Sequence, residues 1–247
     1  MKLYFTLIEL LVLVTIISIL GSLLLPVMGG AKYQSKLTQC IGNEHQLGVA
    51  ISRYSSDFNE FLPRLSVNVE GGCRPAIKYN GVDDRPLLQS YMSLNDVLVC
   101  PLTRKIDLAG SSSNNVYSSY ELWFGSTVLA YESEGMMKIT DTLGWNGNQF
   151  KVMASSLDAW HPAYWQSSHP DRNVGLLTPR RLNSTGILQS LWMNGNDPAR
   201  GNIDRNFLFT DGSVEQILNV KMLDTRLKPI PYFSNSTTAR LCYLPAQ

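Results

Sequence analysis

The N-terminal region contains the stretch that decides the fold, residues 5–28, which read FTLIELLVLVTIISILGSLLLPVM. Glu9 is the one charged residue in this stretch. As a helix the stretch extends about 36 Å, which is enough to cross a hydrocarbon layer of about 30 Å. A secretory signal peptide is the alternative, but its apolar core has only about 7–15 residues and ends at a small-residue site, unlike residues 23–26. The stretch therefore predicts a transmembrane helix.

Glu9 needs an explanation, because a carboxylate within a membrane helix costs a few kcal/mol. One interpretation places Glu9 near the headgroups, where its side chain reaches water. The other pairs it with a cation inside an assembly. Lys2 precedes the stretch and Lys32 and Lys36 follow it, so the positive charges do not fix the orientation of the helix.

The chain as a whole has the composition of a folded protein. The 247 residues are 44% hydrophobic and 17% charged, which allows one good core or at most two small domains. The net charge is +1, so no global field favours nucleic acid, and no nucleic-acid partner is expected.

The first part of the apolar stretch, Phe5 to Val12, resembles the processing and methylation segment of type IV prepilins and type II secretion pseudopilins. In that family a prepilin peptidase cuts before the Phe and methylates the new amine, which implies a cut between Tyr4 and Phe5. Glu9 and Pro26 then fall where the family carries its acidic residue and a helix-bending proline. The family usually has Gly before the cut, so Tyr4 leaves an uncut, permanently anchored chain as the alternative.

The resemblance also implies partners and a location. Glu9 would meet the N-terminal amine of a neighbouring subunit, and the two charges would neutralise each other in lipid and set the axial register. The other implied partners are the prepilin peptidase, further pilin-like subunits, an inner-membrane assembly platform and membrane lipid. The chain would cross the bacterial inner membrane once, with its globular domain in the periplasm or on an extracellular fibre.

Residues 29–60 continue the helical pattern, although Pro26, Gly29 and Gly30 should weaken or bend the helix. Apolar residues recur there at helical spacings and predict a face that packs on a sheet; they are Leu37, Ile41, Leu47, Ile51, Tyr54 and Phe58. The segment from Cys40 to Gly48, with Leu62-Pro63, is similar to a large subgroup of pseudopilin-like proteins.

These observations predict an α+β fold. A leader at residues 1–4 precedes a transmembrane helix at 5–28 and an amphipathic helix at 29–60. The globular domain at 61–247 is expected to be a mainly antiparallel sheet on which the long helix packs, as in pilins.

Later segments give weaker signals. Asp83-Asp84 could cap a short helix that ends at Tyr91, and residues 120–131, 152–159 and 187–193 have strand-like composition. Residues 206–214, NFLFTDGSV, predict a hairpin with Asp211-Gly212 as its turn. The subgroup often has a His ten positions before this Asp, where this chain has Gly201, so Asp-Gly is assigned a plain turn role.

Four cysteines, Cys40, Cys73, Cys100 and Cys242, have no metal-knuckle spacing. In an exported domain their even number suggests disulfides, with three possible pairings, and free buried thiols are the alternative. The family-like segments contain Cys40 and Cys100, so the resemblance favours that pair and leaves Cys73 with Cys242.

No cofactor is expected. Four oxygen-bearing residues near the C-terminus would suit calcium, but their spacing matches no EF-hand loop, so calcium stays an alternative; they are Asp197, Asn202, Asp204 and Asp211. Residues 158–171 contain Asp158, His161, His169 and Asp171 with two tryptophans, and are interpreted as a surface loop rather than a metal site.

The sequence contains no nucleophile with an identifiable base and no phosphate-binding loop, so an enzyme is not expected. The leading prediction is a pilin-like subunit of a type II secretion or type IV pilus-like assembly. The alternative is a membrane-anchored binding module in which tryptophans stack on carbohydrate; these are Trp123, Trp145, Trp160, Trp165 and Trp192.

Overall fold

The computed structural model divides the chain into two compact units, Met1–Thr38 and Gln39–Gln247. It describes residues 6–65, 76–79, 81–102, 108–112, 116–125, 137–145, 148–156, 158–161, 164–167, 181–182, 188–190, 202–221, 227–231 and 241–245. Each unit is considered by itself below. Helix α1, Leu7–Asp57, contributes its N-terminal residues to the first unit and its C-terminal residues to the second.

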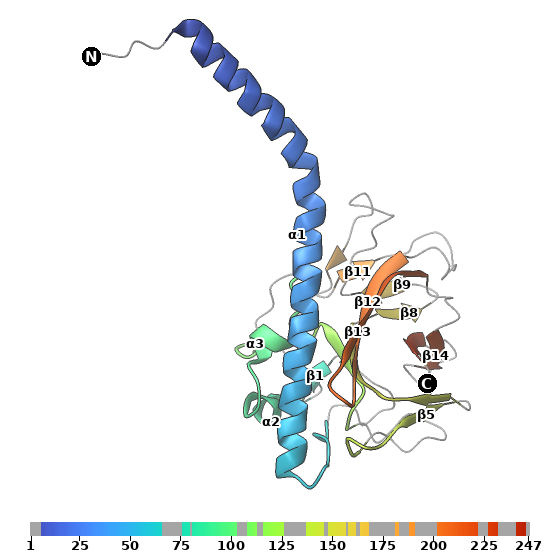
Figure 1. Ribbon diagram of the computed structural model, residues 1–247. Helices are drawn as coiled ribbons and strands as arrows, with labels where there is room; N and C mark the ends of the chain where they lie inside the picture. The colour runs from blue at the N-terminus through green and yellow to red at the C-terminus, as the bar shows by residue number, and fades with distance from the viewer. Residues whose placement is uncertain are drawn as a thin grey trace. The chain divides into compact units, whose positions relative to one another are not determined.

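In the first unit, α1 is apolar and long enough to cross a membrane from Leu7 to Leu24, by length and composition. Hydroxyl side chains in this span donate back to carbonyl oxygens of the same helix, Thr15 to Val12 at 2.8 Å and Ser18 to Val14 at 2.7 Å. Such bonds satisfy polar groups that lipid cannot. Figure 1 shows α1 as one continuous helix. Its bounds, Leu7–Asp57, include Pro26 and the glycines after it, so these residues do not end the helix.

The second unit contains the rest of α1, two short helices and fifteen strands among the described residues. The helices are α2, Arg85–Gln89, and α3, Leu94–Val97. The strands are β1 Ala76–Tyr79, β2 Val82–Asp83, β3 Val116–Tyr117, β4 Tyr120–Leu122, β5 Leu143–Trp145, β6 Asn148–Phe150, β7 Val152–Ser156, β8 Asp158–His161, β9 Tyr164–Ser167, β10 Arg181–Leu182, β11 Leu188–Ser190, β12 Asn202–Phe209, β13 Val214–Lys221, β14 Leu227–Pro231 and β15 Leu241–Pro245.

Every strand pairing within the described ranges is antiparallel, which confirms the expected mainly antiparallel sheet. The strands form a sheet of order β13-β12-β7-β4, a six-stranded sheet of order β10-β11-β9-β8-β15-β14, and two smaller ones, β2-β1-β3 and β5-β6. With the apolar N-terminal helix, this is the α+β arrangement that the sequence predicts.

The four-stranded sheet places residues from distant segments in cross-strand rows. One row is apolar: Ala154 on β7 is opposite both Leu122 on β4 and Leu208 on β12. The next row is polar, because Tyr120 on β4 is opposite Ser156 on β7, and the Ser156 hydroxyl accepts the Asn206 N–H of β12 at 3.1 Å. Residues two apart on a strand share a face, so both rows lie on the same side of the sheet.

The C-terminal part of α1 joins the main apolar cluster of the second unit. Leu47 and Ile51 are fully buried there, as the amphipathic pattern predicts, whereas Phe58 is 46% exposed. An ideal Cβ on Gly48 would lie 3.0 Å from Leu208 Cδ1, so the missing side chain lets α1 approach β12 closely. The helix ends where Asn59 and its neighbour Glu60 adopt positive φ, 51° and 69°.

Three sequence expectations differ from the structure in detail. The strand expected from residue 120 ends at Leu122, because Gly125 takes φ of 67° and turns the chain beside Pro63; residues 126–131 lie outside the described ranges. The helix expected to reach Tyr91 ends at Gln89. The surface loop expected over 158–171 is instead a β8–β9 pair as far as Ser167, since aromatic residues there favour strands.

Candidate functional site

The start of α1 is held by reciprocal hydrogen bonds between Thr6 and Glu9. The Thr6 backbone N–H and hydroxyl donate to Glu9 Oε2 at 2.9 and 2.6 Å, and the Glu9 N–H donates to the Thr6 hydroxyl at 3.3 Å. This capping box satisfies N–H groups that every helix leaves unpaired at its N-terminus. The pattern Thr-x-x-Glu before an apolar run is its sequence signal, and it gives Glu9 a local role that neither sequence interpretation included.

The other residues of the predicted processing and assembly segment are only partly described. Tyr4 and Phe5 lie outside the described residues, and for Pro26 only the helical backbone is described. The large apolar side chains from Leu7 to Leu24 are 47–82% exposed. A continuous apolar surface of this kind needs lipid or other apolar helices around it.

In the second unit, four residues on one face of α1 fasten the helix to the domain; we call this the helix-docking seam. They are Cys40, Asn43, Glu44 and Gly48, spaced so that they share a face. Cys40 forms a disulfide with Cys100, with Cα atoms 5.5 Å apart. This is the pairing that the family resemblance implied.

Asn43 adds a second connection to the same segment. Its side-chain amide donates to the Val99 carbonyl oxygen at 3.1 Å, next to the disulfide. Asn43 is buried, so the bond is made away from water. The segment Cys40 to Gly48, selected in the sequence only by its resemblance, therefore has a defined structural task in docking α1.

Glu44 is the unexpected member of the seam, because its side chain is fully buried. The Ser156 hydroxyl donates to Glu44 Oε1 at 3.4 Å, while Oε2 has no hydrogen-bond partner. Burial raises the pKa of the Glu44 carboxyl well above its ordinary value, and the Ser156 hydrogen bond opposes this shift.

Tyr120 lies in the same environment. Burial raises the pKa of the Tyr120 phenol well above its ordinary value, the charge of Glu44 adds to the shift, and Asn43 opposes it. The Tyr120 hydroxyl nevertheless has no partner at hydrogen-bonding geometry. Sequence reasoning gave neither residue a role, since only the strand register brings Tyr120, Ser156 and Asn206 together.

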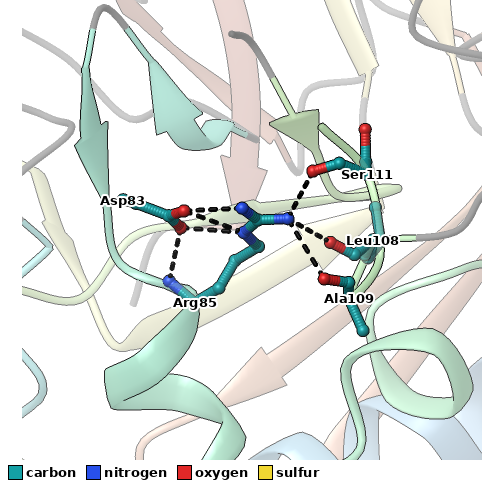
Figure 2. A network of polar contacts seen from close by, with 5 residues as sticks. All are labelled: Asp83, Arg85, Leu108, Ala109 and Ser111. Atoms are coloured by element: carbon teal, nitrogen blue, oxygen red, sulfur yellow. Dashed lines mark hydrogen bonds and ion pairs between the residues drawn. The ribbon is translucent and has the colours of Figure 1, made fainter. Parts of the chain in front are cut away.

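A second polar network joins β2, α2 and the segment after α3, as Figure 2 shows. The Arg85 guanidinium donates to the Asp83 carboxylate at 2.6–3.1 Å and to the carbonyl oxygens of Leu108, Ala109 and Ser111 at 2.8–3.2 Å. The Arg85 hydrogen bonds lower the pKa of Asp83. Asp84 is the N-cap residue of α2 but makes no side-chain capping bond, whereas Asp83, one position earlier, accepts the Arg85 backbone N–H at 3.2 Å.

The other residues predicted from the sequence are a turn pair and two cysteines. Asp211 and Gly212 form the turn between β12 and β13; Asp211 accepts the Ser213 N–H and hydroxyl at 2.9 and 2.6 Å, which lowers the pKa of Asp211. Cys73 lies outside the described residues, and Cys242 belongs to β15 without a described side chain.

The calcium alternative does not fit the positions of its carboxylates. Asp204 is fully buried on β12, whereas Asp211 is exposed beyond the end of that strand, about 17 Å or more away at the rise of an extended strand. Asn202 begins β12, and Asp197 lies outside the described residues. No group of three or more His, Cys, Asp or Glu side chains in the described ranges is placed to hold a metal ion.

The tryptophans proposed as a carbohydrate platform divide into a core residue and residues whose side chains are not described. Trp123 is fully buried, and its indole N–H donates to the Ser155 hydroxyl at 2.9 Å, so it supports the core. Trp160 and Trp165 are register partners in β8 and β9. Trp145 lies in β5, and Trp192 is outside the described residues.

Comparisons with protein families, curated proteins and solved structures find no match for this chain. Function is therefore inferred from two features, the capped apolar start of α1 and the helix-docking seam.

Proposed function

We propose that the chain is a pilin-like structural subunit of a type II secretion or type IV pilus-like assembly, anchored in the bacterial inner membrane. The observation that carries the proposal is the exposed apolar helix from Leu7 to Leu24, which begins at a Thr6–Glu9 capping box within the Phe-Thr-Leu-Ile-Glu segment. A prepilin peptidase would process this segment at Phe5, and other subunits would surround the helix.

The geometry of Glu9 leaves room for a second role. Both bonds from Thr6 go to Oε2, and in the described part of the chain Oε1 accepts no hydrogen bond. A neighbouring subunit's amine can therefore approach Oε1 while the capping box stays formed. In lipid that contact would replace an uncompensated charge by a neutral pair.

The Cys40–Cys100 disulfide supports an exported domain, because such bonds persist in oxidising compartments. The same face of α1 that carries Cys40 docks on the domain by Asn43, Glu44 and Gly48. A subunit pulled by its helix during assembly needs such an attachment between helix and domain.

Two variants separate the cap from the charge. Glu9→Gln keeps the capping box, because Gln serves at this position, but removes the charge. Thr6→Ala removes the capping hydroxyl and keeps the charge. We expect Glu9→Gln to abolish fibre or oligomer formation, measured by cross-linking in the native membrane, and Thr6→Ala to retain most of it.

The intact mass of the membrane-derived protein completes the test. A chain that begins at N-methylated Phe5 would support the proposal, and one that still begins at Met1 would favour the anchored binding module. Normal assembly by Glu9→Gln would refute the charge-pairing role and leave Glu9 as a cap alone.

A further inference from the structure

The polar row under α1 surrounds one buried carboxyl group. Three neighbouring strands contribute to the row, with Tyr120 on β4, Ser156 on β7 and Asn206 on β12. Glu44 of α1 meets the middle strand through Ser156. Asn206 extends the row by accepting the Gln216 side-chain amide at 3.0 Å, while its own amide nitrogen has no partner.

Nothing in this row neutralises a negative charge on Glu44. Its neighbours on the sheet are a phenol, a hydroxyl and an amide, and in the described part of the chain no cation pairs with it. Strand alternation places the charged residues Glu121 and Arg205 on the opposite face of the sheet, because Tyr120 and Asn206 face α1. Asp204 on β12 is itself a carboxylate and so offers Glu44 no positive charge; it has contacts of its own.

The flanking attachments of α1 do not titrate in the ordinary range. Cys40 is covalently bonded, Asn43 is uncharged, and Gly48 packs against Leu208. An ionised carboxylate buried between them would lose its hydration without gaining an ion pair, which is unfavourable. A neutral carboxyl group keeps the Ser156 bond and avoids that cost.

We propose that Glu44 is a proton-operated latch, in which the protonated carboxyl group docks α1 on the four-stranded sheet and loss of the proton weakens that docking. The latch depends on the geometry of the second unit and not on the proposed fibre role. The raised pKa of the Glu44 carboxyl agrees with it. A domain exposed to the external medium would thereby respond to the pH of that medium.

The sign of the response follows from linkage. When α1 is detached, Glu44 titrates near the ordinary Glu value of about 4.3; when α1 is docked, it holds its proton to higher pH. Docking is therefore strongest below the ordinary value. Above that value the equilibrium constant for docking falls about tenfold per pH unit. It becomes constant once Glu44 is also ionised in the docked form.

The test uses the full chain in detergent micelles and measures hydrogen exchange of α1 residues 39–57 as a function of pH, corrected for intrinsic rates. Glu44→Gln is the matched neutral variant, and Glu60→Gln removes an exposed carboxylate of the same chain as the control. We expect the opening equilibrium of the wild type to rise up to about tenfold per pH unit relative to Glu44→Gln. Glu60→Gln should follow the wild type.

Parallel pH profiles for the wild type and Glu44→Gln would overturn the latch. If Glu44→Gln fails to fold, carbon-13 NMR of labelled Glu carboxyl groups in the wild type decides the question. One Glu signal that titrates far above the others would support the latch, and titration of every Glu in the ordinary range would refute it.

Discussion

Replacement of Gly125 by alanine should be among the most destabilising single changes in this protein. Gly125 is buried and has φ of 67°. An ideal Cβ there would lie 1.8 Å from the Pro63 carbonyl oxygen, 2.8 Å from the Pro63 carbonyl carbon and 3.0 Å from Arg64 Cα. All three are backbone atoms, so no side-chain rotation can relieve the overlap.

Two further glycines allow the cost to be divided into its parts. Gly81 and Gly212 also have positive φ, 85° and 80°, but no atom lies within 4 Å of an added Cβ. Alanine at either position carries only the left-handed backbone penalty, about 1–2 kcal/mol. At Gly125 the overlap adds an overpacking cost of about 1–3 kcal/mol, so the total is about 2–5 kcal/mol.

The assay is denaturant unfolding of the full chain in detergent, comparing the free energy of unfolding of Gly125→Ala, Gly81→Ala and Gly212→Ala with that of the wild type. We expect the Gly125 variant to lose about 1–3 kcal/mol more than either control, or to fail to fold. An equal loss in all three would refute the reasoning, because it would show that the chain does not approach Pro63 closely in solution.

Two other predictions concern the attachments within the second unit. The disulfide closes a sequence separation of 60 residues, so replacing Cys40 and Cys100 by Ser should lower the free energy of unfolding by about 4 kcal/mol. Reductant should shift the unfolding of the wild type by more than that of the double variant, which keeps Cys73 and Cys242. Equal shifts in the two proteins would contradict the Cys40–Cys100 bond. Arg85→Lys keeps the charge but cannot bond the Asp83 carboxylate and three carbonyls together, so it should cost about 2 kcal/mol in the same assay. Because the pKa of Asp83 is lowered in the folded protein, its contribution to the free energy of unfolding is present above the ordinary Asp range and is lost as pH falls through the lowered pKa. If the wild type and Arg85→Lys lost the same amount of stability on acidification, that result would argue against the Asp83–Arg85 pair.

The features that the sequence predicts are those encoded by neighbouring residues. The helix from Leu7 to Leu24 follows from uninterrupted apolar composition, and the turn at Asp211-Gly212 follows from the dipeptide itself. The Thr6–Glu9 capping box can likewise be predicted from the sequence, because its two residues are three positions apart. Local signals of this kind need no knowledge of the fold.

The contacts of the helix-docking seam cannot be predicted from the sequence pattern, because they join segments that are distant in the chain. Ser156 meets Glu44 across 112 residues and Asn206 across 50. A glutamate on an amphipathic helix ordinarily belongs to its solvated face. Only the register of β4, β7 and β12 shows that Glu44 faces a buried row that also contains Tyr120.

The seam fastens α1 by a disulfide, two hydrogen bonds and one close packing contact, and this has a consequence for how the helix can be released. Cys40 responds to reductant, Glu44 to pH, and Asn43 and Gly48 to neither. Because Cys40 and Glu44 are one turn apart, reduction and rising pH act on adjacent points of the same helix face. Their effects on docking should therefore exceed the sum of the two separate effects, since each remaining attachment limits the opening that the other permits.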